Sequence, residues 1–241
     1  MRWAIISDLH ANLEAFRAVL TKIDSLNVDK TICLGDVVGY NASPNECVDL
    51  VRERGIDTIC GNHDAVACGK EEPWGFNPVA LAAALWTRES LTEESHQWLR
   101  SLPDSLEYDD FLAVHGSPDD RDCYMLTWEH VIPHVSYLES RSYDLCFFGH
   151  THSPGIFAAD GMYSVDENAK FALGRGKVFF INPGSVGQPR DGDPRASFGL
   201  LDTEKREFEL IRVEYPVREA ADKIIEKGLP QVLADRLFLG R

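Results

Sequence analysis

Residues 3–10, Trp-Ala-Ile-Ile-Ser-Asp-Leu-His, place an aspartate and a histidine directly behind an apolar, strand-like run. Four more short polar clusters also follow apolar runs, namely Gly35-Asp36, Gly61-Asn62-His63-Asp64, His115-Gly116 and Gly149-His150-Thr151-His152. Five of the eight histidines fall inside these clusters, which is unlike a scatter of core or surface histidines. Because open α/β sheets present their chemistry at strand ends, the pattern predicts an α/β fold with one polar site there.

The apolar runs predict the strands. Most are short and do not alternate with polar residues, which is typical of strands covered on both faces. The predicted strands are residues 3–7, 30–34, 57–60, 111–114, 144–148, 178–181, 197–202 and 207–213. Residues 203–206 between the last two are few enough for a hairpin. An early parallel set with a late antiparallel pair implies a mixed sheet, or two sheets stacked between helical layers.

Helical patterns lie between and after these strands. Apolar residues recur at helical spacing from 13 to 26 behind Asn12, a predicted N-cap. Pro133 fits the first turn of one later helix or kinks it, and Gly228 and Pro230 interrupt the last one. The other predicted helices are residues 45–54, 77–91, 93–102, 129–143 and 217–239.

Composition bounds the function. The 241 residues suit one domain over 1–241, and no run approaches the ~20 apolar residues of a membrane span. The net charge of −15 makes tight binding to a nucleic-acid backbone unexpected. The six cysteines form no Cys-x-x-Cys pair, which predicts reduced, structural thiols. With no room for a signal peptide before Asp8, the expected location is the cytoplasm.

The clusters supply the ligands for two divalent metal ions. A two-metal hydrolytic site needs a group shared between the ions and open positions for water and phosphate. Asp36 is the natural shared group, because a carboxylate has two oxygens to divide between two ions. No thiolate is present in the clusters, so a structural zinc site rich in cysteine is not expected. The seven predicted ligands are Asp8, His10, Asp36, Asn62, His115, His150 and His152.

His63 is predicted to have a different role. It follows Asn62 directly and cannot easily bind the same ion, so we assign it to the phosphate or the leaving group. A histidine in that place can protonate the departing alkoxide or stabilise developing charge.

Taken in order, the five clusters resemble the calcineurin-like metallophosphoesterase superfamily, whose pattern is Asp-x-His, Gly-Asp, Gly-Asn-His-Asp/Glu, His and Gly-His-x-His. Residues 182–190, Asn-Pro-Gly-Ser-Val-Gly-Gln-Pro-Arg, resemble the extra block of its small bacterial and archaeal phosphodiesterase-like branch. The resemblance implies a four-layer α/β/β/α sandwich with mixed sheets and a catalytic role for His63. It also implies one ion held by Asp8, His10, Asp36 and His152, and a second held by Asp36, Asn62, His115 and His150.

One departure from the family bears on the substrate. Protein Ser/Thr phosphatases continue Gly-Asp with two residues and then Asp-Arg-Gly, whereas residues 35–41 here are Gly-Asp-Val-Val-Gly-Tyr-Asn. The acid that orients the catalytic histidine and the arginine that grips phosphate are therefore both missing. Arg190 and Tyr40 are the candidates for contacting phosphate instead.

The resulting hypothesis is a dinuclear phosphodiesterase acting on a small phosphate ester. A metal-bound hydroxide would attack phosphorus in line, and Mn²⁺ is the first choice of metal, with Fe, Ni, Co or Zn also compatible. A Ser/Thr-type phosphomonoesterase, a dinucleoside polyphosphate hydrolase and a non-catalytic metal-binding scaffold remain open alternatives. The loops 65–76 and 119–128, which carry Trp74, Tyr124 and Trp128, either form substrate walls or pack on the chain itself. The sequence leaves the oligomeric state open.

Overall fold

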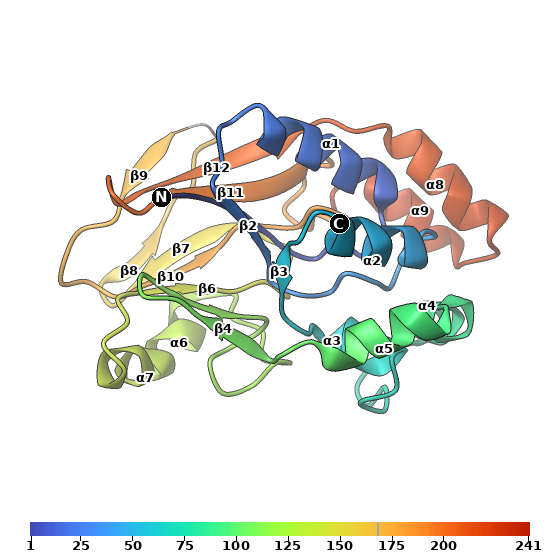
Figure 1. Ribbon diagram of the computed structural model, residues 1–241, viewed down its shortest axis with the longest axis horizontal. Helices are drawn as coiled ribbons and strands as arrows, with labels where there is room; N and C mark the ends of the chain where they lie inside the picture. The colour runs from blue at the N-terminus through green and yellow to red at the C-terminus, as the bar shows by residue number, and fades with distance from the viewer. Residues whose placement is uncertain (168) are drawn as a thin grey trace.

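Two six-stranded mixed sheets form the centre of the fold in a computed structural model that describes residues 1–167 and 169–241 (Figure 1). The first sheet has the order β3 (Asp57–Thr58), β2 (Lys30–Cys33), β1 (Arg2–Ile6), β11 (Ala196–Asp202), β12 (Glu207–Val213), β9 (Lys170–Ala172). The second has the order β4 (Ser105–Glu107), β5 (Leu112–Val114), β6 (Leu145–Phe147), β10 (Phe179–Asn182), β7 (Gly155–Ala158), β8 (Gly161–Tyr163).

Each sheet combines a parallel set with antiparallel additions. Strands β1, β2 and β3 are parallel, as are β5, β6 and β10, so the polar clusters that follow them emerge at common edges. Strand β11 pairs antiparallel with both β1 and β12, and the latter pairing confirms the predicted hairpin. The predicted mixed topology is thus confirmed, in its two-sheet form.

Three apolar clusters separate four layers. Ile5, Ile32 and Phe147 belong to the cluster between the two sheets. On the outer face of the first sheet, Ile6 and other strand residues pack against helices, and on the outer face of the second sheet Phe180 does so. Side chains that alternate along a strand therefore belong to different apolar clusters, one on each face of the sheet. This is the packing of the α/β/β/α sandwich that the family resemblance implies.

The helices cover the two outer faces (Figure 1). Helices α1 and α8 lie over the sheet that contains β11 and β12, and α6 and α7 lie on the opposite side of the molecule. The helices are α1 (Leu13–Asp24), α2 (Pro44–Glu53), α3 (Asn62–Ala67), α4 (Pro78–Ser90), α5 (Glu93–Ser101), α6 (Trp128–Val131), the 3₁₀ helix η1 (Ile132–His134), α7 (Val135–Ser140), α8 (Val217–Glu226) and α9 (Gln231–Leu237). No helix in the described ranges is both long and apolar enough to cross a bilayer.

Several predicted elements need correction. The single helix expected over 129–143 is three short pieces, because Pro133 lies in a 3₁₀ turn that breaks it. Residues 65–67, expected as loop, complete α3, and the loop 119–128 ends where Trp128 starts α6. Strands β4, β7, β8 and β9 were not predicted.

All eight predicted strands are present, as are the break before α9 and the cap of α1, where Asn12 Oδ1 accepts from the Ala15 N–H. All six cysteines are free thiols.

Candidate metal centre

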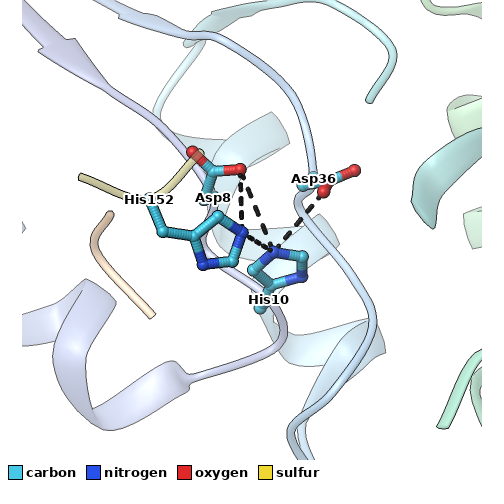
Figure 2. Close-up of side chains that lie close together, drawn as sticks. All are labelled: Asp8, His10, Asp36 and His152. Atoms are coloured by element: carbon cyan, nitrogen blue, oxygen red, sulfur yellow. Dashed lines mark hydrogen bonds and ion pairs between the residues drawn. The ribbon is translucent and has the colours of Figure 1, made fainter. Parts of the chain in front are cut away.

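Four predicted ligands from three chain segments converge at the strand ends (Figure 2). Nε2 of His10 lies 3.0 Å from Nε2 of His152 and 3.4 Å from Oδ2 of Asp36. Oδ1 of Asp8 lies 3.4 Å from Nε2 of His152. All four side chains are buried, so the atoms that could bind a metal face one another and not the solvent.

A second group of ligands shares Asp36 with the first. Asp36, His115 and His150 each offer a donor atom within 4.8 Å of the others. Nε2 of His115 lies 3.5 Å from Asp36 Oδ2, and 3.1 Å from Oδ1 of Asn62. The structure therefore brings all seven predicted ligands together, in the two sets implied by the family resemblance.

Backbone carbonyls fix which ring nitrogen each histidine presents. Nδ1 donates to a main-chain oxygen at 3.1 Å in His10, 2.7 Å in His115 and 2.7 Å in His152, which leaves Nε2 free as the donor to a metal. In His150 the roles of the two ring nitrogens are exchanged: Nε2 donates to the Asp122 carbonyl at 3.2 Å, which leaves Nδ1 free to bind a metal. Carbonyl partners of this kind orient metal-binding imidazoles and fix their tautomers.

The donor set fits a cation. In these tautomers Nε2 of His10 and Nε2 of His152 are both unprotonated, so two lone pairs face each other across 3.0 Å. Within the described part of the chain, Oδ2 of Asp36 is buried and accepts no hydrogen bond. Buried acceptors without a donor are costly. A divalent cation among the three atoms would satisfy all of them, and mixed imidazole and carboxylate ligation suits several such ions.

Burial and charge set the protonation states. Burial lowers the pKa of His10 and of His152 well below the ordinary value and lowers that of His150 to about 3, so these rings are neutral, the form that binds metal. Burial also opposes protonation of His115, but the charge of Asp36 raises its pKa to about 9.

The backbone is left-handed at five of the ligands. A non-glycine residue rarely adopts positive φ, and each such residue costs free energy that the surrounding structure must offset. Here φ lies between 46° and 64° at Asp8, His10, Asp36, His150 and His152. This conformation turns the side chains out of the strand direction, so His150 and His152, two residues apart, reach different ligand groups.

The loop after β10 holds in place the loop that carries Asp8 and His10. Ser185 Oγ and the Gly187 N–H both donate to the Asp8 carbonyl, each at 2.9 Å. The approach is so close that a Cβ on Gly187 would overlap the Leu9 carbonyl oxygen, which is why only glycine fits there.

Asn182 holds in the same way the loop that carries His150 and His152. Its Nδ2 donates to the Gly149 carbonyl at 2.7 Å and to Thr151 Oγ1 at 3.0 Å, and it is fully buried. The segment 182–188 therefore fixes the loops that carry candidate ligands from both sheets.

His63 lies beside the ligands. The main-chain N–H of His63 donates to Asp36 Oδ1 at 2.8 Å. Its ring Nδ1 is buried and has no hydrogen-bond partner among the described residues. Burial lowers the pKa of His63 to about 4. The neighbouring acid, Asp64, does not orient this ring, because its carboxylate accepts from the Val38 and Gly61 N–H groups at 3.1 Å each.

Gly39 stands where the Ser/Thr phosphatases carry the acid that orients the histidine. Its φ is 98°, and a Cβ built on it would lie 2.6 Å from Nδ1 of His63. The His63 ring therefore occupies the space that a side chain at position 39 would need.

Tyr40 and Arg190, the candidate phosphate contacts, lie together. The Arg190 guanidinium carbon is 5.5 Å from the centre of the Tyr40 ring, a cation–π distance. Arg236 of α9 lies near this pair, and burial together with the charge of Arg190 lowers its pKa. Nη2 of Arg190 donates to Gln188 Oε1 at 3.0 Å, and its buried Nε has no hydrogen-bond partner among the described residues. Nε of Arg236 donates to the main-chain oxygen of Arg241, the last residue. The remaining N–H groups of the two guanidiniums offer a place for an anion.

A cavity of about 280 Å³ opens beside this centre. Trp74 and Tyr124 line it, whereas Trp128 lies outside the lining and donates from Nε1 to the Ala158 carbonyl at 2.8 Å. The cavity is lined by Tyr40, Asn62, His63, Trp74, Gly75, Phe76, Asn77, Ala80, Asp122, Tyr124 and His150.

Sequence reasoning missed three residues at the site: Phe76, Asp122 and Arg236. Phe76 follows Trp74 within a loop already considered, so its apolar side chain was the available signal. Asp122 contributes its main-chain carbonyl, which leaves no trace in side-chain chemistry. Arg236 comes from a C-terminal helix without a motif, and only the folded chain places it near Arg190.

Comparison with known proteins gives consistent matches. The family model for the calcineurin-like phosphoesterase superfamily domain matches residues 1–206. The uncharacterized protein MJ0912 of Methanocaldococcus jannaschii is 40% identical over 99% of this chain and 98% of its own length. Phosphodiesterase MJ0936 of the same organism is 26% identical over 89% of this chain and 100% of its own. A metallophosphoesterase crystal structure from Sphaerobacter thermophilus superposes with a TM-score of 0.88 at 38% identity, covering 100% of this chain and 99% of that one.

Proposed function

The chain belongs to the calcineurin-like phosphoesterase superfamily, and from that premise we propose that it hydrolyses small phosphodiesters at a centre of two divalent ions. Membership makes it a metal-dependent phosphoester hydrolase. The observation that carries the finer proposal is that two groups of buried ligands share one carboxylate, Asp36.

The ligands would be divided around that carboxylate. Asp8, His10 and His152 would complete one site, and the second would be completed by Asn62, His115 and His150. Mn²⁺ is the first choice, with Fe, Ni, Co and Zn compatible with the same nitrogen and oxygen donors. When bound, the ions supply positive charge at the phosphate oxygens and lower the pKa of water.

The chain's own residues would bind and orient the ester. Arg190 and Arg236 would hold non-bridging phosphate oxygens, with Tyr40 beneath Arg190. His63 would donate from its ring to the leaving oxygen as charge develops there. Carbonyl-bound imidazoles keep the ligand atoms in place and so limit reorganisation during the reaction.

Two observations favour a diester over a monoester. Gly39 replaces the acid of the Ser/Thr phosphatase pattern. Two sequence relatives, MJ0936 and YfcE of Escherichia coli, the latter 24% identical over 85% of this chain, are named phosphodiesterases.

The test is hydrolysis of bis(p-nitrophenyl) phosphate and p-nitrophenyl phosphate by protein loaded in turn with each candidate metal. We expect the diester to have the higher kcat/KM and elemental analysis to give about two ions per chain. Asp36→Asn should lose metal and activity together, whereas Asp49→Asn, an exposed helix residue, should change neither. No hydrolysis with any metal would favour the scaffold role, and a strong monoester preference would favour a phosphatase.

A further inference from the structure

Four aromatic side chains line the cavity beside the candidate metal centre: Tyr40, Trp74, Phe76 and Tyr124. We call this the aromatic cavity. At about 280 Å³ it lies near the lower end of the volumes of small-molecule sites, so it accommodates one ring system and not a long chain. None of the ligand or hydrogen-bonding roles described above requires a cluster of aromatic rings at this place.

The rings reach the histidines of the site. The ring centre of His63 is 4.3 Å from that of Tyr40 and 4.8 Å from that of Phe76. On the other side, the Tyr124 ring is 4.1 Å from that of His150. The aromatic cavity is therefore continuous with the position of the reacting phosphate, on the side where His63 would assist the leaving group.

The outer walls are open to a ligand. Trp74 is 87% exposed and Tyr124 is 47% exposed, which is unusual for large aromatic side chains that only stabilise a fold. Phe76, by contrast, is half-buried, packs against the helical core cluster and directly precedes Asn77, the N-cap of α4. A fixed inner ring and exposed outer rings together suit stacking of a planar group.

The charges on the walls exclude a highly anionic ligand. Among the described lining residues there is one carboxylate, Asp122, and no lysine or arginine. Arg190 lies beside Tyr40, and Arg236 lies near both Tyr40 and Tyr124 but outside the lining. Within the lining, a leaving group with further phosphates would meet only the negative charge of Asp122, whereas a neutral ring with N–H groups could donate to it.

We propose that the aromatic cavity binds an uncharged planar aromatic ring, aryl or nucleobase, on the leaving group of the phosphodiester. This inference rests on the proposed function and specifies its substrate class. It disfavours dinucleoside polyphosphates, whose additional phosphates would lack cationic partners in the cavity. Trp74 and Phe76 are specificity residues in this proposal, because they would contact the leaving group and not the phosphorus.

The experiment compares ligands that carry the same phosphate group. Calorimetry on Mn²⁺-loaded protein would measure Kd for adenosine 5′-monophosphate, phenyl phosphate and glycerol 3-phosphate. We expect at least one of the aromatic ligands to bind about five- to a hundredfold more tightly than glycerol 3-phosphate, since stacking of one base contributes that much. Tight binding of phenyl phosphate alone would identify an aryl site, and tighter binding of the nucleotide a nucleobase site.

Variants assign the effect to the cavity. Trp74→Ala and Phe76→Ala should reduce the preference for aromatic ligands, while glycerol 3-phosphate keeps its Kd. Phe238→Ala removes another partly exposed ring, at the end of α9 and outside the cavity, and should leave the preference intact. Because Trp74 is so exposed, its removal is not expected to affect folding.

The two proposals fail in different ways. Equal Kd values for all three ligands, or an unchanged preference in Trp74→Ala and Phe76→Ala, would overturn the aromatic site while hydrolysis of bis(p-nitrophenyl) phosphate persists. Absence of that hydrolysis with every metal would overturn the proposed function, and the substrate class with it.

Discussion

Nε2 of His10 and Nε2 of His152 face each other at 3.0 Å, although each ring already donates its Nδ1 proton to a carbonyl. The two residues come from different sheets, since His10 follows β1 and His152 follows β6. Without a cation between them, the facing lone pairs repel and oppose the closure of the two sheets at this edge. Metal binding should therefore be coupled to the stability of the fold.

Metal removal should lower the melting temperature. At a free metal concentration about a hundred times Kd, binding to the native state adds about 2.7 kcal/mol, or about 5–10 °C in Tm for a chain of this size. Differential scanning calorimetry with Mn²⁺ and then with excess chelator measures the difference. His10→Ala should abolish most of the metal response, and the exposed His130→Ala should retain it. Identical melting curves with and without metal would contradict the coupling.

His63→Ala should retain the metals and lose turnover. Removing a group that assists the leaving oxygen typically costs about 10²–10⁴-fold in rate. The loss in kcat should be larger for an alkyl leaving group than for p-nitrophenol, because p-nitrophenolate departs without assistance. Metal content by elemental analysis serves as the control. Unchanged turnover of an alkyl ester would refute the role given to His63.

Gly39→Ala should reduce kcat by displacing His63. The added Cβ would lie 2.6 Å from Nδ1 of that ring, and positive φ adds backbone strain of about 1 kcal/mol. Gly55→Ala is the matched control, since Gly55 also has positive φ but its Cβ would meet nothing within 4 Å. Both variants should lose stability in urea unfolding, Gly39→Ala by more because of the contact with His63, and only Gly39→Ala should lose turnover. Equal kcat in the two variants would mean that the contact with His63 is unimportant.

Asn182→Ala should weaken metal binding without removing a ligand. Loss of its hydrogen bonds to Gly149 and Thr151 frees the loop that carries His150 and His152, and loss of such supporting contacts costs about 10–100-fold in metal affinity. Competition with a metal-sensitive dye measures the Kd.

The control for that experiment is Asn45→Ala. Asn45 also joins two segments, by hydrogen bonds to Ser90 and Thr92 at 2.8 and 2.9 Å, but it lies outside the site. We expect it to lower stability and leave the metal Kd unchanged. A metal Kd in Asn182→Ala equal to that of the wild type would show that Asn182 has no effect on the ligand loops.

Local sequence was sufficient to locate most of the site. Each candidate ligand comes within a few residues of the end of a strand whose apolar run is visible in the sequence, so the strand end and the candidate ligand are predicted together. The strands β4, β7, β8 and β9 were missed because they contain only three or four residues and three of them are not fully buried. Their pairing depends on the neighbouring strand and not on their own pattern.

What the sequence determined by itself is the set of parallel and antiparallel strands and the chemical types of the candidate ligands, because both follow from short-range patterns of apolar and polar residues. Only the tertiary structure decided that the strands divide into two sheets, that Asn182 fixes a distant loop, and that Arg236 and the aromatic rings adjoin the site. Those relations depend on the distances between residues far apart in the chain, which sheet register and side-chain packing set.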